Sequence, residues 1–300
     1  MGATPVEEAR DTSSTRIEYA PGIQGKGIFR VRERCIADSL ALLIRSPGAV
    51  KLYLILRGIC LPPDNHGSRE PGEVLPHVTY EDLHDLCRDP RQFSTATPED
   101  YVSEAEDRAK KREWVREQLA ALEDHKLVRR HDFGTGDRPR LVVLKDDGSG
   151  DPIDDPDGGA GSSYVTVHGS VLSAPTFLEW GAPEVFAYLC AMVAGRYAAN
   201  KQGGDPASAT WFQAAKWFTT DETARPMTHV LFPIGAKTIQ RGLRRLTEQG
   251  WIQATKTSRD PRGRGRRFRK PRNVYENRFD RFDAIAPVVD LSAERGRRLA

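Results

Sequence analysis

The sequence predicts a mostly α-helical protein with small β-hairpins, an α+β chain whose two halves follow one plan. Three observations lead to this prediction. Helical patterns recur in both halves, each half ends in a pair of short strand patterns, and an acidic segment rich in Gly and Pro lies between them. A chain of 300 residues, 38% hydrophobic and 29% charged, is long and apolar enough for two domains with cores of their own.

Charge is distributed unevenly along the chain. Residues 1–145 contain 23 Lys and Arg against 24 Asp and Glu, a net charge of −1, and residues 146–163 add six Asp without a base. Residues 164–300 contain 22 basic against 12 acidic side chains, a net charge of +10. We therefore expect any polyanion to bind the C-terminal half.

The first half, residues 26–145, follows a polar arm over residues 1–25 that we expect to be disordered. Helices are predicted over 36–44, 80–88 and 104–126, and strands over 27–32, 127–130 and 141–144. Residues 49–60 are predicted to form an apolar helix or another buried segment. Thr79 is placed to cap the helix that begins at Tyr80. The helix over 104–126 interleaves bases with acids at i,i+3 and i,i+4, which favours a solvated or protein-contacting surface over a nucleic-acid contact.

Residues 146–163 are almost entirely Asp, Gly, Ser and Pro, which predicts a flexible acidic linker. A calcium-binding loop is excluded there. In the only suitable frame, Ile153 and Tyr164 would occupy its first and last ligand positions.

The second half, residues 164–283, repeats the plan and leads into a basic extension over 284–300. Helices are predicted over 182–200, 213–219 and 236–249, and strands over 210–212, 251–256 and 273–279. One apolar pattern recurs with a shift of 124 residues, which indicates an internal duplication. Its members are Leu119, Leu122, Leu127 and Val128, repeated as Leu243, Leu246, Trp251 and Ile252.

The helix over 236–249 has an apolar stripe of Ile239, Leu243 and Leu246, and the rest of its surface is basic or polar. We predict nucleic-acid contacts from Lys237, Thr238, Gln240, Arg241, Arg244 and Arg245. Arginine can bridge the acceptors of guanine, glutamine can pair with adenine, and Lys and Thr suit phosphates near a helix N-terminus. The alternative is an amphipathic helix whose bases only solvate it.

Eight of the fourteen residues from 259 to 272 are basic, and only Asp260 opposes them. Mutual repulsion disfavours such a run unless a polyanion shares its charge. The basic residues are Arg259, Arg262, Arg264, Arg266, Arg267, Arg269, Lys270 and Arg272. The order helix, strand, arginine-rich turn, strand is that of a winged helix-turn-helix, with the basic run as its wing. A solvated loop and an RNA-binding arginine-rich segment are the alternatives.

The segment LRRLTEQGWI with the basic hairpin after it resembles the recognition helix and wing of bacterial winged-helix proteins. Two such units in tandem, over about 46–145 and 164–283, resemble the replication initiators of plasmids and other mobile elements. This resemblance implies a first unit that can form homodimers and a second that grips repeated double-stranded DNA. A winged-helix transcriptional repressor and a nicking enzyme remain alternatives.

Catalysis and metal binding find little support in the sequence. Phosphate-loop and nucleophile-elbow motifs are absent, and His77, His84 and Cys87 lack a fourth ligand at zinc spacing. We expect no enzyme activity and no cofactor, with Tyr275 as the one tyrosine nucleophile to test. The scattered cysteines and the lack of a signal peptide or membrane span predict a cytoplasmic protein with reduced thiols, associated with nucleoid or plasmid DNA.

Overall fold

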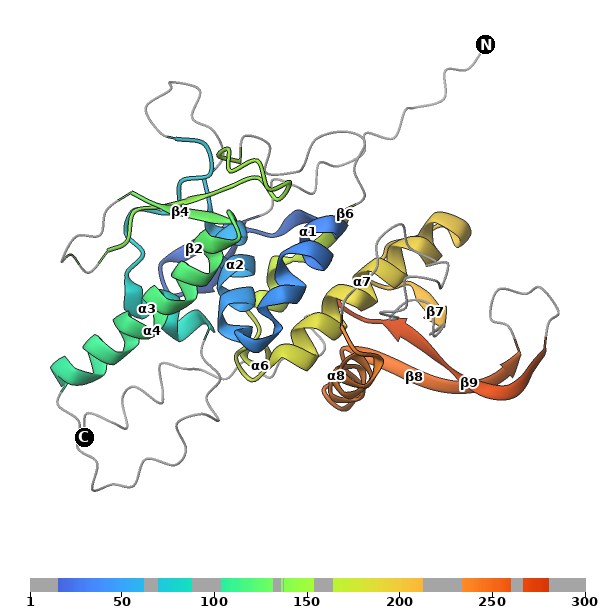
Figure 1. Cartoon of the computed structure of the whole chain (residues 1–300). Coiled ribbons are helices and arrows are strands. Elements are labelled where there is room, and N and C mark those ends of the chain that lie inside the picture. The colour runs from blue at the N-terminus through green and yellow to red at the C-terminus, as the bar shows by residue number, and fades with distance from the viewer. Residues whose placement is uncertain are drawn as a thin grey trace, which may run out of the picture.

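A computed structural model gives the structure of the chain and describes residues 16–61, 70–87, 104–131, 136, 138–153, 164–212, 234–259 and 267–280. It is a mixture of helices and small antiparallel sheets, which confirms the predicted α+β class (Figure 1). The predicted helix over 213–219 lies outside the described residues.

The first half consists of two hairpin strands, a third strand, a helical block, and a final strand pair. Its strands are β1 (Arg16–Ala20), β2 (Ile23–Lys26), β3 (Ile28–Arg32), β4 (Val128–Arg130) and β5 (Leu141–Val143). Its helices are α1 (Glu33–Asp38), the 3-10 helix η2 (Leu40–Arg45), α2 (Pro47–Ile59), α3 (Tyr80–Cys87) and α4 (Glu104–Asp124).

The second half begins with a strand and contains one long central helix. Its strands are β6 (Tyr164–His168), β7 (Thr210–Phe212), β8 (Ile252–Arg259) and β9 (Arg267–Asn277). Its helices are α5 (Gly169–Leu172), α6 (Pro175–Leu178), α7 (Ala182–Gln202) and α8 (Ala236–Glu248). The bounds of α7 and α8 agree with the predicted helices to within two residues.

The last strand pairs of the two halves share part of their pairing. In the second half the sheet order is β7-β9-β8, so the last strand lies between the other two. In the first half β5 pairs with β4 on one side, and on the other side Val142 of β5 forms a bridge with Glu73. In each half, therefore, a short segment that follows the first long helix pairs with the last strand.

The turns that lead from α4 into β4 and from α8 into β8 have the same hydrogen-bond pattern. The Leu127 N–H donates to the Leu122 carbonyl at 3.0 Å, and 124 residues later Trp251 N–H donates to the Leu246 carbonyl at 2.9 Å. Both corners turn through a residue of positive φ, Lys126 at 54° and Gly250 at 82°. This bond pattern and the left-handed residue form a Schellman-type helix end.

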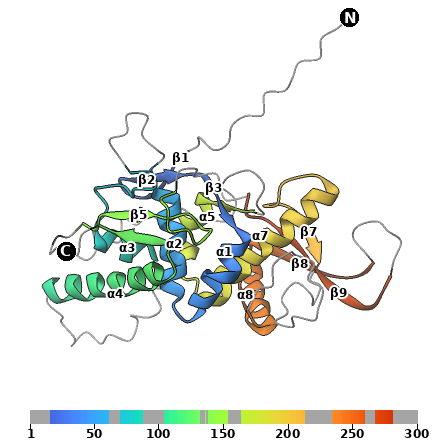
Figure 2. The ribbon, with the colours of Figure 1, turned by 45° about the horizontal axis from the view of Figure 1, so that its top comes forward.

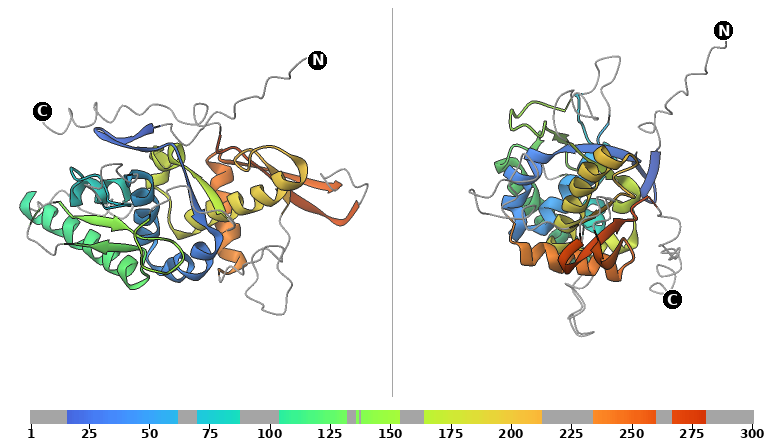
Figure 3. Two further views of the ribbon diagram at one scale, coloured as in Figure 1. Left: turned by 90° about the horizontal axis from the view of Figure 1, so that it is seen from above. Right: turned by 90° about the vertical axis from the view of Figure 1, so that its right-hand side faces the viewer.

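The helices and strands of the two halves lie together in one body (Figures 2 and 3). A sheet and buried polar contacts join them. β3 of the first half pairs with β6 of the second along all five residues of each strand. The buried Lys51 ammonium of α2 donates to the carbonyls of Leu178 (3.0 Å) and Trp180 (3.2 Å). One continuous apolar cluster extends from Tyr19 to Phe279 and includes residues of both halves.

The expected disordered arm is wrong for residues 16–25, where β1 and β2 form an antiparallel hairpin. Tyr19 and Ile23 are buried, and the Tyr19 hydroxyl donates to the Lys26 carbonyl at 2.9 Å. The hairpin contacts α2, where Gly58 has no side chain and lets the Tyr19 ring approach closely. The two apolar side chains that hold the hairpin are too few to stand out in a polar, Gly-punctuated segment.

The expected flexible linker is also wrong for its first part, residues 146–153. The Asp146 carboxylate accepts the Arg32 N–H at 2.7 Å and lies 3.1 Å from the Arg32 Nε. Ile153 is buried, and its N–H donates to the Val143 carbonyl at 3.1 Å. The composition of this segment is that of a linker. The composition does not reveal these contacts, because one comes from Arg32, more than a hundred positions away, and the other from a single Ile. Residues 154–163 lie outside the described part of the chain.

Candidate nucleic-acid interface

Helix α8 has one buried face and one charged face. Ile239, Gly242, Leu243 and Leu246 are buried against the second half of the molecule, as the apolar stripe predicted. Gly242 lies so close to α7 that an added Cβ would collide with the carbonyl oxygen of Pro183. The missing side chain lets α8 lie directly on the start of α7, and this contact sets the direction of the charged face.

The polar residues predicted on this helix lie on its outward side. Thr238 is half-buried, and the other five are exposed: Lys237, Gln240, Arg241, Arg244 and Arg245. Arg244 forms an ion pair with Glu248 at 2.9 Å, and Arg245 lies 3.7 Å from Glu184 of α7. Among the described residues, no partner is found for the side chains of Lys237, Gln240 and Arg241.

Two tryptophans lock the C-terminal end of α8. Trp180 Nε1 donates to the Gln249 side chain at 2.8 Å, and Trp251 Nε1 donates to the Thr176 hydroxyl at 3.2 Å. Both indoles are buried and meet edge-to-face with centroids 6.1 Å apart. Such packing holds the exposed face of α8 in a fixed orientation, which recognition of a ligand requires.

Strands β8 and β9 continue beyond the body as a two-stranded ribbon (Figure 1). β7 pairs with residues 274–276 of β9, and within the described residues no third strand pairs with the rest of the ribbon. On β8, the exposed residues are Gln253, Ala254, Thr255, Lys256 and Ser258, whereas Val274 and Tyr275 of β9 are buried. Arg259 and Arg267 are register partners across the two strands.

The structure places only part of the predicted basic run. Arg259 lies at the end of β8, and four further predicted residues lie on the backbone of β9: Arg267, Arg269, Lys270 and Arg272. Arg262, Arg264 and Arg266 lie outside the described residues. The register of the ribbon shifts between Thr257 and Arg259. The β9 segment opposite this shift contains Pro271, which has no N–H to donate to the strand ladder.

The base of the ribbon is rigid because Asn277 joins three elements. Its side-chain amide accepts from Trp211 Nε1 at 2.9 Å and donates to the carbonyls of Ala191 (2.9 Å) and Pro206 (2.8 Å). Tyr275 is buried beside it and stacks on Trp211 with ring centroids 4.8 Å apart. Tyr275, the tyrosine considered above as a nucleophile, is thus packed in the core.

Several bases in the first half lie against acids. In the final hairpin, Arg129 contacts Glu70, Arg130 contacts Glu123, and Arg140 lies 3.4 Å from Glu73. On α4, Lys111 lies 3.4 Å from both Asp85 and Asp107, and Arg108 lies 3.9 Å from Glu81.

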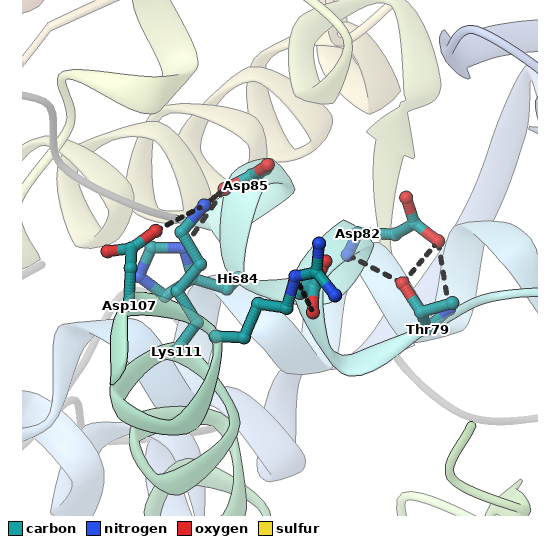
Figure 4. A network of polar contacts seen from close by, with 8 residues as sticks. Thr79, Asp82, His84, Asp85, Asp107 and Lys111 are labelled. Carbon is teal, nitrogen blue, oxygen red and sulfur yellow. Dashed lines mark hydrogen bonds and ion pairs between the residues drawn. The ribbon is translucent and has the colours of Figure 1, made fainter. Parts of the chain in front are cut away.

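Figure 4 shows this neutralisation where α3 meets α4. Lys111 lies between Asp85 and Asp107, next to His84. Burial alone would raise the pKa of Asp85, but the hydrogen bond from His84 and the charge of Lys111 hold that pKa below its ordinary value. The acids Asp85 and Asp107 make the surface of α4 a poor match for a polyanion.

The predicted cap of helix α3 is also present, since the Asp82 N–H donates to the Thr79 hydroxyl at 3.1 Å.

The histidine and cysteine residues weighed as zinc ligands have other surroundings. His84 and Cys87 are buried, and His84 packs edge-to-face on Trp114 with centroids 5.2 Å apart. His77 is bonded through Nε2 to the Gly22 carbonyl at 3.1 Å. In the described ranges, no group of three or more His, Cys, Asp or Glu side chains could hold a metal ion.

Sequence reasoning missed three residues of this region: Glu184, Glu248 and Asn277. The i,i+4 spacing of Arg244 and Glu248 on one helix was a readable signal for their pair. Glu184 and Asn277 act across 61 and 66 positions of sequence, to Arg245 and Trp211, and no local pattern marks them.

All helices in the described parts of the chain are too short or too polar to cross a membrane. No protein-family model matches the chain, and no match was found among curated proteins or solved structures.

Proposed function

We propose that the chain consists of two winged-helix units in tandem and binds double-stranded DNA site-specifically through the second unit. The observation that carries the proposal is the outward face of α8, where Lys237, Gln240 and Arg241 lie exposed without a partner among the described residues, beside a ribbon with several arginines. The duplicated strand order and helix corners support two units of one plan.

Helix α8 suits the major groove, which is about 12 Å wide and accepts one α-helix. Its buried face is fully used by the core, so the opposite face is available to a ligand. Residues at the start of such a helix contact base edges and nearby phosphates. Lys237, Gln240 and Arg241 occupy the first two turns of α8.

The ribbon of β8 and β9 suits the phosphate backbone and the neighbouring minor groove. Arg259 and Arg267 are register partners in the ladder, and like charges at such paired positions of a sheet repel. When the ribbon binds DNA, the phosphates neutralise these arginines and relieve that repulsion. The binding also releases the counterions that were condensed on the phosphates. Arginines also enter narrow minor grooves favourably.

The process we propose is initiation of replication or segregation of a plasmid or mobile element, with the first unit as a homodimer contact. The paired charges of α4 and of the β4–β5 hairpin support a protein-facing role for that unit. An array of direct repeats as the preferred site supports this process. A single palindrome beside a promoter would instead identify a repressor.

The experiment selects duplexes from a random pool with the full chain and measures their affinity by fluorescence anisotropy. A Lys237→Ala/Arg241→Ala variant should lose roughly 1–3 kcal/mol of discrimination between the selected and random duplexes. The charge-matched control is Lys110→Ala/Arg116→Ala on α4, which should change this discrimination between duplexes little. Selection of no duplex, or tighter binding to single-stranded RNA, would overturn the proposal.

A further inference from the structure

The ion pair between Arg244 and Glu248 lies on the surface of α8 that the proposed function turns toward DNA. The Arg244 Nε donates to a Glu248 carboxylate oxygen at 2.9 Å, and the two side chains are 83% and 55% exposed. On a helix, Lys237, Arg241, Arg244 and Glu248 fall on one stripe opposite the buried face. Glu248 thus places an anion where a polyanion would bind.

Helix stability does not explain an acid at this position. Glu248 is the last residue of α8, where the negative end of the helix dipole disfavours an anion. The acid also follows its base by four residues, which is the less stabilising orientation of such a pair. An exposed ion pair contributes little to folding in any case.

We propose that Glu248 is a positioning residue that holds Arg244 for base recognition and lowers its affinity for phosphates. The inference rests on the proposed function of the second half. The hydrogen bond to Glu248 uses Nε and so leaves the two terminal guanidinium nitrogens of Arg244 outside this bond. Those two donors match the O6 and N7 acceptors of guanine. The carboxylate repels phosphates that would otherwise capture Arg244 at any sequence.

The test compares Glu248→Gln with the parent on a selected duplex and on a random duplex. Glutamine can still accept from Nε but carries no charge, so binding to random DNA should tighten. We expect the ratio of specific to random affinity to fall roughly tenfold, within the range of one base contact. Glu117→Gln, an exposed acid of α4, makes the same change of net charge and should leave the ratio unchanged.

A double-mutant cycle separates this role from a general effect of charge. If Glu248 acts through Arg244, Glu248→Gln should not lower the ratio further in an Arg244→Ala background. Equal effects in both backgrounds would overturn the inference, as would an unchanged ratio in the Glu248→Gln single variant. Failure of the parent to prefer any duplex would instead overturn the proposed function.

Discussion

Asn277 is the residue on which the geometry of the ribbon depends most. Its buried amide satisfies an indole N–H and two backbone carbonyls from three other parts of the second half. Replacement by Ala leaves these groups buried without partners, and each such group costs about 1–3 kcal/mol.

We therefore expect Asn277→Ala to lower the free energy of unfolding by about 3 kcal/mol in urea titrations followed by circular dichroism. Asn273→Ala, an exposed residue of the same strand, is the matched control and should change it by less than about 0.5 kcal/mol. Equal stabilities of the two variants would contradict the joining role of Asn277.

The burial of individual residues could be predicted from the sequence where the apolar residues follow a regular spacing. Ile239, Leu243 and Leu246 are buried as their spacing predicts, and all four cysteines are buried and free of disulfides. Burial raises the pKa of the Cys87 thiol to about 12. The period says nothing of which acid meets which base, because Glu184 and Glu70 reach their partners through the tertiary fold.

At the scale of elements, the duplicated helix corner is the clearest structural repeat. The first copy holds Lys126 in the left-handed region, whereas the second has glycine at the matching place. Non-glycine residues pay a steric penalty of about 1–2 kcal/mol in that conformation. A Cβ at Gly250 would meet no atom within 4 Å, so only the backbone opposes a side chain there.

Two opposite substitutions test the corner. Lys126→Gly should raise the free energy of unfolding by about 0.5–1 kcal/mol, less than the full penalty because glycine also gains freedom in the unfolded chain. Gly250→Ala should lower it by about 1 kcal/mol. Urea titration of both variants measures these changes, and effects of the same sign would show that the corners are not equivalent.

Elements with a strong period were predicted well, and elements held by distant partners were not. α4, α7 and α8 follow their apolar spacing, whereas β9 begins at Arg267, six residues before the predicted strand over 273–279. The β1–β2 hairpin depends on a tyrosine that fits over Gly58, and the segment 146–153 depends on Arg32. The pairing of β3 with β6 joins residues far apart in the sequence, as Arg30 with Thr166, 136 positions later, and no local pattern encodes it.

At the scale of the whole molecule, the halves are expected to unfold together. They share the β3–β6 ladder, the buried Lys51 contacts and one apolar cluster. Differential scanning calorimetry should show one transition, with the calorimetric and van't Hoff enthalpies equal. Two resolved transitions would contradict a shared core and would indicate two independently stable units.

Charge is the second property of the whole molecule, and it is the basis of the central claim. The second half is basic by sequence, and the bases Lys237, Arg241 and Arg244 of α8 and Lys256 of β8 are exposed. Acids neutralise many of the bases in the first half. Duplex affinity should therefore depend on the wing.

The most direct test is the salt dependence of duplex binding by a variant with Arg264, Arg266, Arg267 and Arg269 replaced by Ala. Each lost phosphate contact lowers the slope of log K against log salt by about 0.9, so we predict a slope smaller by about 2–3, with weaker binding to every duplex and an unchanged melting temperature. A variant that binds as tightly as the parent, with the same slope, would contradict the account.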